Sequence, residues 1–70
     1  MSTKNTSLKN VKILRIKKGW TQERLAQEAG ISYHTLIKIE RGDIKDPRLE
    51  TIKKLSRSLE ISIDKLVGYE

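Results

Sequence analysis

The chain contains no cysteine and no phenylalanine, and its 70 residues include one histidine, one proline and one tryptophan. The absence of cysteine excludes disulfide bonds and thiolate metal sites, and His34 alone cannot form a zinc site. The sequence also has no phosphate-binding glycine loop and no nucleophile and base at a suitable spacing. We therefore expect no metal, no cofactor and no enzymatic activity.

Long apolar runs are absent as well. No segment approaches the roughly 20 apolar residues that span a bilayer, and residues 1–7 lack the apolar core of a signal peptide. We interpret residues 1–7 as a flexible tail and residues 8–70 as one domain, whose small core leaves little room for a ligand cleft. These absences predict a cytoplasmic protein with no membrane partner and no small-molecule ligand.

The chain carries more positive than negative charges. Fifteen lysine and arginine residues against nine aspartate and glutamate residues give a formal net charge of +6. This balance favours a polyanionic partner such as nucleic acid. The alternative is a basic surface that is only solvated.

Apolar residues recur at the three- and four-residue spacing of helices from Leu8 onward. The pattern predicts five helices, and a glycine follows four of them, as is typical of a helix C-terminus. The fourth helix is predicted to begin at Pro47, with Asp46 as its N-cap and an apolar stripe from Leu49 to Leu59. The other predicted helices span about residues 8–18, 22–29, 33–41 and 63–67, followed by glycines 19, 30, 42 and 68.

Three of the predicted helix starts share one local signal. In each, an apolar residue precedes a hydroxyl residue, and a leucine follows four positions after the hydroxyl. This is the pattern of an N-cap with a hydrophobic staple. It assigns Thr21, Ser32 and Ser62 as N-caps, and it favours core packing of Trp20 over a surface role as a stacking platform.

The second and third predicted helices are joined only by Gly30-Ile31-Ser32. Two short helices with a three-residue turn that contains glycine are typical of a helix-turn-helix. Gly30 permits the sharp turn, Ile31 anchors the turn in the core, and Ala26 lets the helices approach. A simple αα-hairpin within a bundle would use the same residue types and is the alternative.

Three segments carry a family resemblance: Thr21-Gln22-Glu23-Arg24-Leu25-Ala26, Gly30-Ile31-Ser32 and Ile39-Glu40-Arg41-Gly42. With the helix layout of residues 8–67, they resemble the Cro/C1-type (XRE-like) helix-turn-helix family of phage repressors and bacterial regulators. The resemblance implies an all-α, compact five-helix domain of the lambda-repressor-like type, and a transcriptional regulator that binds double-stranded DNA sequence-specifically. In one departure, relatives often carry serine after the proline of the fourth helix, whereas Arg48 follows Pro47 here.

The third predicted helix has an apolar face and a polar face at 100° per residue. Leu36 and Ile39 point toward the core, and the opposite face carries an imidazole, an ammonium and a guanidinium group. These groups can donate to base edges or phosphates in a major groove, although a solvated polar face is the plain alternative. The predicted base-reading residues, which the resemblance also implies, are Tyr33, His34 and Lys38.

Contacts to the DNA backbone are implied mainly by the resemblance. In relatives, a glutamine at the position of Gln22 contacts the backbone, and a helix N-terminus offers free N–H groups to phosphate. Arg41 is expected to contact phosphate or to act as a charge at a helix C-terminus. For Thr21 the alternative is a cap role, and for Lys45 and Arg48 it is plain surface charge. The predicted backbone contacts are Thr21, Gln22, Arg41, Lys45 and Arg48.

Arg15 and Glu40 lie on the apolar faces of the first and third predicted helices. Opposite charges in such positions are expected to pair, and the resembling family has a salt bridge at these positions. We therefore predict a structural ion pair between Arg15 and Glu40.

The resemblance leaves the assembly and the biological role open. Relatives often dimerise through the fifth helix and neighbouring surface, here residues 61–69, so we expect a homodimer. An antitoxin or a restriction-modification controller would use the same DNA-binding domain. A protein-interaction module without DNA binding is a further alternative.

Overall fold

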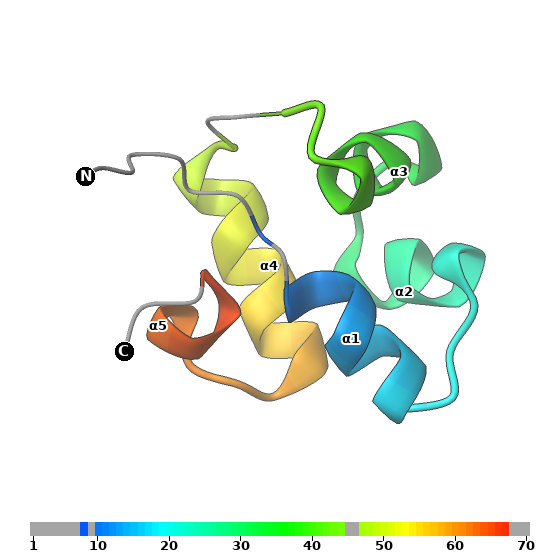
Figure 1. Ribbon diagram of the computed structural model, residues 1–70, viewed down its shortest axis with the longest axis horizontal. Coiled ribbons are helices and arrows are strands. Elements are labelled where there is room, and N and C mark those ends of the chain that lie inside the picture. The colour runs from blue at the N-terminus through cyan, green and yellow to red at the C-terminus, as the bar shows by residue number, and fades with distance from the viewer. Residues whose placement is uncertain (1–7, 9, 45–46, 68–70) are drawn as a thin grey trace.

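The computed structural model describes residues 8, 10–44 and 47–67. Within these ranges no helix has both the length and the apolar character needed to cross a membrane. The predicted tail, residues 1–7, lies outside the described residues, as do Lys45, Asp46 and Gly68. The described ranges contain five helices, which are α1 (Asn10–Lys17), α2 (Gln22–Ala29), α3 (Tyr33–Arg41), α4 (Leu49–Leu59) and α5 (Ile63–Leu66) (Figure 1). The prediction of an all-α, five-helix domain is confirmed.

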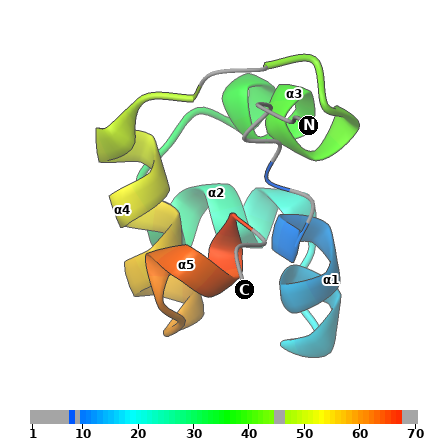
Figure 2. The ribbon, with the colours of Figure 1, turned by 60° about the vertical axis from the view of Figure 1, so that its left-hand side comes forward.

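The helices enclose one apolar core. α2 contacts both α3 and α4, while α1 and α5 pack against α4 and against each other (Figures 1 and 2). Burial of these aliphatic side chains supplies the main favourable term in folding. The fully buried side chains with the largest volumes are Leu25, Leu36, Leu55, Leu66 and Val11.

The three predicted hydroxyl caps are confirmed. Thr21 Oγ1 accepts a hydrogen bond from Arg24 N at 3.0 Å, and Ser62 Oγ accepts one from Lys65 N at 3.2 Å. Ser32 Oγ accepts from the backbone N–H groups of His34 and Thr35, at 3.1 and 3.4 Å. Each hydroxyl satisfies N–H groups that have no partner inside the helix. The caps therefore fix where α2, α3 and α5 begin.

Replacing Ser32 with alanine is expected to lower the free energy of unfolding by about 1 kcal/mol, since α3 loses its only side-chain cap. Urea unfolding followed by circular dichroism measures the change. The matched control is Ser32→Asn, because asparagine caps about as well as serine and should retain most of the stability. Equal stability of the alanine variant and the unmodified protein would show that the cap contributes nothing.

The prediction that the fourth helix begins at Asp46 and Pro47 is wrong. α4 begins at Leu49, and its N-cap is Arg48, which has extended backbone and no capping hydrogen bond from its side chain. Pro47 is buried and lies before the helix rather than in its first turn. The proline ring is therefore used for packing, and the start of α4 is set by tertiary structure rather than by a local cap.

The ends of the helices show smaller differences. α1 begins at Asn10 rather than at Leu8, which is buried ahead of the helix, and α5 ends at Leu66 with Val67 as its C-cap. α4 ends at Leu59, and its C-cap Glu60 has φ of 55°, a left-handed conformation that favours glycine. The backbone N–H of Ile61 donates to Ser56 O at 3.1 Å there. Because no glycine follows Leu59, this end of α4 could not be recognised from the local residues.

Candidate nucleic-acid interface

The turn between α2 and α3 has the geometry that the sequence predicts. Gly30 has φ of 73° and ψ of 35°, and its N–H donates to Ala26 O at 2.9 Å. The N–H of Ile31 donates to the same carbonyl at 3.0 Å, and the Ile31 side chain packs partly buried against the core. A residue with a Cβ atom would be strained at this φ. The turn therefore holds α3 at a fixed angle across α2.

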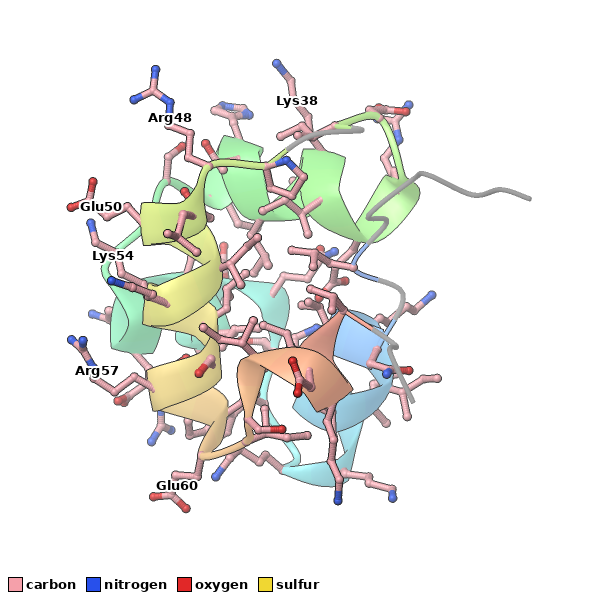
Figure 3. All side chains as sticks on the ribbon, turned by 90° about the vertical axis from the view of Figure 1, so that its left-hand side faces the viewer. Lys38, Arg48, Glu50, Lys54, Arg57 and Glu60 are labelled. Carbon is pink, nitrogen blue, oxygen red and sulfur yellow. The ribbon has the colours of Figure 1, made fainter. Side chains whose placement is uncertain are left out.

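α3 separates into a buried face and an exposed face. Leu36 and Ile39 are buried, whereas His34 and Lys38 are exposed and Tyr33 is 40% exposed. The amphipathic orientation predicted for α3 is confirmed. Figure 3 shows Lys38 pointing outward from the end of the molecule that α3 occupies. An edge of α3 with donor groups is thus available to a large ligand.

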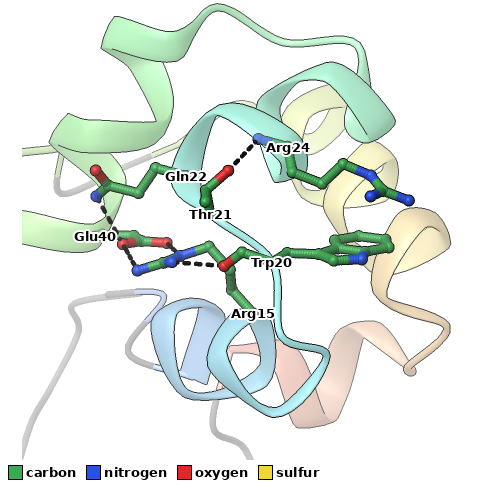
Figure 4. Close-up of polar contacts among 6 residues, drawn as sticks. All are labelled: Arg15, Trp20, Thr21, Gln22, Arg24 and Glu40. Carbon is green, nitrogen blue, oxygen red and sulfur yellow. Dashed lines mark hydrogen bonds and ion pairs between the residues drawn. The ribbon is translucent and has the colours of Figure 1, made fainter.

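The predicted ion pair of Arg15 and Glu40 is present and bidentate (Figure 4). Arg15 Nε donates to Glu40 Oε2 at 2.7 Å, and Nη2 donates to Oε1 at 3.1 Å. Arg15 Nη1 also donates to Trp20 O at 2.9 Å. The side chains are 11% and 3% exposed, respectively. The pair is thus shielded from solvent, and it ties α3 to α1 and to the segment before α2.

Gln22 adds a contact that the sequence analysis did not predict. Its Nε2 donates to Glu40 Oε1 at 3.0 Å, so that the amide lies between the N-terminus of α2 and the inner edge of α3 (Figure 4). The sequence analysis assigned Gln22 to the DNA backbone and Glu40 to Arg15, and a neutral amide carries no charge that would indicate a carboxylate partner. One carboxylate therefore holds the first residue of α2 and the body of α3 in a fixed relation.

The other residues predicted to contact the DNA backbone lie in different surroundings. The hydroxyl of Thr21 is the α2 cap, and its hydrogen can still be donated to a phosphate. Arg41 Nε lies 3.4 Å from Asp43 Oδ2. The sequence analysis did not predict this ion pair, although the two residues are only two positions apart. Arg48 is exposed and points outward at the same end of the molecule as Lys38 (Figure 3). Lys45 lies outside the described residues.

Trp20 packs partly buried against the core, as its place in a staple predicts. Two cations that the sequence analysis did not assign lie over its ring: Lys18 Nζ at 4.9 Å from the centroid and Arg24 Cζ at 5.0 Å. Cations over an indole ring are attracted by its quadrupole. The ring is therefore occupied by contacts within the chain, in agreement with a structural role.

A family model described as Helix-turn-helix (HTH_3) matches residues 11–66. The HTH-type transcriptional regulator SlrR of Bacillus subtilis (strain 168) is 37% identical over 60 residues, which are 86% of this chain and 40% of SlrR. The HTH-type transcriptional regulator ImmR of the same organism is 38% identical over 62 residues, 89% of this chain and 48% of ImmR. The chain thus spans less than half the length of these curated relatives.

Solved structures agree with the fold. The biofilm master regulator SinR in complex with DNA has a TM-score of 0.81 and 30% identity, with 86% of this chain and 95% of that chain covered. The restriction-modification controller C.AhdI from Aeromonas hydrophila has a TM-score of 0.79 and 31% identity, with 87% and 91% covered. The chain belongs to the HTH_3 helix-turn-helix family, the Cro/C1-type family that its sequence resembles.

Proposed function

We propose that the chain binds double-stranded DNA sequence-specifically and regulates transcription, with α3 in the major groove. The observation that carries the proposal is the exposed edge of α3, with Tyr33, His34 and Lys38 directed outward while the opposite face is buried. The net charge of +6 favours association with the phosphate backbone. The similarity to SinR, whose structure is a complex with DNA, supports the same conclusion.

The groups on α3 have the chemistry that base recognition needs. The ammonium of Lys38 can donate to guanine O6 and N7, and the phenol and imidazole of Tyr33 and His34 can donate to base edges. Their surface lies on a helix whose position is fixed by the Gly30 turn and the Glu40 contacts. A fixed helix is necessary because base edges are distinguished only at hydrogen-bond distances.

The DNA backbone is contacted in this proposal by the residues that flank α3. The Gln22 amide donates one N–H to Glu40 and keeps a second N–H, beside the free N–H groups at the start of α2, for a phosphate. Thr21 can donate its hydroxyl hydrogen to the same phosphate. Arg41, Lys45 and Arg48 are assigned to phosphates beyond the other end of α3.

Binding as a homodimer to an inverted repeat completes the proposal. Closed two-fold symmetry is the commonest form of soluble oligomers, and a two-fold axis would place two copies of α3 in successive major grooves about 34 Å apart. We assign the dimer contact to the region of residues 61–69. A regulator of this kind would act in the cytoplasm.

Selection of bound sites from random duplexes tests the function. The expected result is a short sequence motif in two inverted copies whose centres are separated by about 10 base pairs, with affinity that falls steeply as salt rises. A single, unrepeated motif would support sequence-specific DNA binding but contradict binding as a homodimer. Absence of duplex binding at low salt, or binding without any sequence preference, would leave a protein-interaction module as the better function.

The substitution Arg48→Ala is expected to weaken binding to all duplexes by a similar factor, because phosphate contacts carry no sequence information. It should also reduce the slope of log K against log salt by about 1. Fluorescence anisotropy at several salt concentrations measures both quantities. Lys17→Ala, at an exposed site on α1, removes the same charge and should change neither. A selective loss for one sequence would reassign Arg48 to base reading.

A restriction-modification controller is a second candidate, because C.AhdI shares the fold at 31% identity. An antitoxin would use the same domain in the same way. The DNA-binding chemistry is common to all three roles, so binding experiments do not separate them. The neighbouring gene does: a restriction endonuclease beside it favours the controller, and a toxin favours the antitoxin.

A further inference from the structure

A second basic surface lies along α4 and is not used in the proposed DNA contact. Two shallow depressions meet there, of about 390 and 430 Å³, and both are lined by Lys54 and Arg57. The first is completed by Leu49, Glu50 and Lys53. The second extends past Trp20 to Lys18 and Glu60. We call the surface formed by both depressions the α4 groove.

Some charged side chains of the α4 groove have an ion-pair partner and others do not. Glu60 is paired with Lys18 at 3.9 Å, and Glu28, which lines the second depression, is paired with Arg24 at 2.9 Å. Lys53, Lys54 and Arg57 form no ion pair with any carboxylate in the described part of the chain. Glu50 has no ion pair there either, so three unpaired cations against one unpaired carboxylate leave the groove with an excess of positive charge.

An apolar group lies beside these cations. Leu49 is 60% exposed, the most exposed large hydrophobic residue in the described ranges. Figure 3 shows Glu50, Lys54 and Arg57 projecting in order down the same side of α4, with Arg48 beyond one end and Glu60 beyond the other. Leucine next to a row of cations provides both a hydrophobic contact and charges for a ligand.

We propose that the α4 groove is a docking surface for an acidic, amphipathic segment of a protein partner. Carboxylates of the partner would face Lys53, Lys54 and Arg57, and an apolar side chain would cover Leu49. A second copy of this chain is not the proposed occupant, because the proposed dimer contact lies in residues 61–69 and none of these residues lines the groove. Charge complementarity thus selects an acidic partner.

DNA is also a polyanion, but it fits the groove less well. Glu50 lines the groove and has no ion pair in the described residues, so an evenly charged phosphate backbone would meet a negative charge there, whereas an amphipathic peptide can place an uncharged residue opposite Glu50. DNA has no aliphatic side chain to cover Leu49. Lys54 and Arg57, which line both depressions, project from the side of the molecule, whereas Lys38 points away from its end (Figure 3). A partner could therefore dock while α3 remains free.

The test is a selection of 16-residue peptides from a displayed random library on the folded protein. The enriched peptides are then synthesised without tryptophan, and their binding is followed by the fluorescence of Trp20, the only tryptophan in the chain, which lines the groove. We expect enrichment of acidic sequences with spaced leucine or isoleucine, and binding that weakens as salt rises.

The groove variant is Lys53→Glu/Arg57→Glu, and both residues are exposed, so the fold should persist. The matched control is Lys12→Glu/Lys17→Glu, which changes the net charge equally at two exposed sites on α1 that do not line the groove. Peptide affinity should fall by about tenfold or more in the groove variant and by less than about twofold in the control. Circular dichroism before each titration verifies that both variants are folded.

Three results would overturn the proposal. The first is failure to enrich acidic peptides, or equal loss of affinity in both variants, which would mean attraction to net charge alone. The second is a selective loss of duplex affinity in the groove variant, which would make the groove a nucleic-acid surface. The third is a change in self-association in the groove variant, measured by sedimentation velocity, which would assign the groove to a second copy. Peptide binding is measured without DNA, so its outcome is separate from the test of DNA binding.

Discussion

Replacement of Glu40 with alanine is expected to lower the free energy of unfolding by about 3–5 kcal/mol, because it leaves the Arg15 guanidinium buried without its carboxylate. For a domain of this size, that loss corresponds to a fall in melting temperature of about 12 °C or more. The loss is large because Arg15 is only 11% exposed and cannot regain full hydration in place. Thermal and urea unfolding measure the effect.

Two further variants identify the cause of this loss. Glu28→Ala also removes an ion pair with an arginine, but Arg24 and Glu28 are 52% and 43% exposed, so the expected loss is below about 0.5 kcal/mol. The double variant Arg15→Met/Glu40→Leu removes both charges and should recover most of the stability lost in Glu40→Ala. If the double variant is as unstable as Glu40→Ala, the packing around Glu40 and the lost hydrogen bonds to Gln22 and Trp20 O, rather than the stranded charge, determine the loss.

The bounds of α2 and α3 could be predicted from sequence because their signals are local. Thr21 and Ser32 cap the starts, and Gly30 and Gly42 follow the ends with positive φ. A cap or a left-handed residue acts within a few positions of itself, so its effect can be read from neighbouring residues. The faces of α3 follow from the same kind of information, because helical periodicity alone separates Leu36 from Lys38.

The features that escaped prediction depend on tertiary structure. The burial of Pro47 delays the start of α4, and Glu60 adopts a left-handed conformation without the usual glycine. Neither property is visible in the adjacent residues. The bond from Gln22 to Glu40 depends on how α2 crosses α3, and a residue pattern along one helix contains no such information. Within the site, the exposure of the α3 side chains could thus be predicted, whereas the hydrogen bond from Gln22 to Glu40 could not.

Replacement of Lys38 with alanine is expected to reduce sequence discrimination by about 1–3 kcal/mol, or about 5- to 150-fold in the ratio of specific to non-specific affinity. The reason is positional: Lys38 lies on α3, the helix proposed to enter the major groove, and points outward from it (Figure 3), so the proposal assigns its ammonium to a base edge. Affinities for the selected site and for an unrelated duplex of equal length, measured at one salt concentration, give the ratio. Lys17→Ala, at an exposed site on α1, is the control for loss of one positive charge.

Comparison with Arg48→Ala makes the test of Lys38 specific. Both residues are exposed cations at the same end of the molecule, so a purely electrostatic model predicts equal losses for every duplex. Base reading predicts instead that Lys38→Ala lowers affinity for the selected site far more than for the unrelated duplex, and that Arg48→Ala lowers both alike. Repeating the site selection with Lys38→Ala should then yield a motif degenerate at one base pair per half-site. An unchanged motif would mean that Lys38 contacts phosphate and that Tyr33 and His34 read the sequence without it.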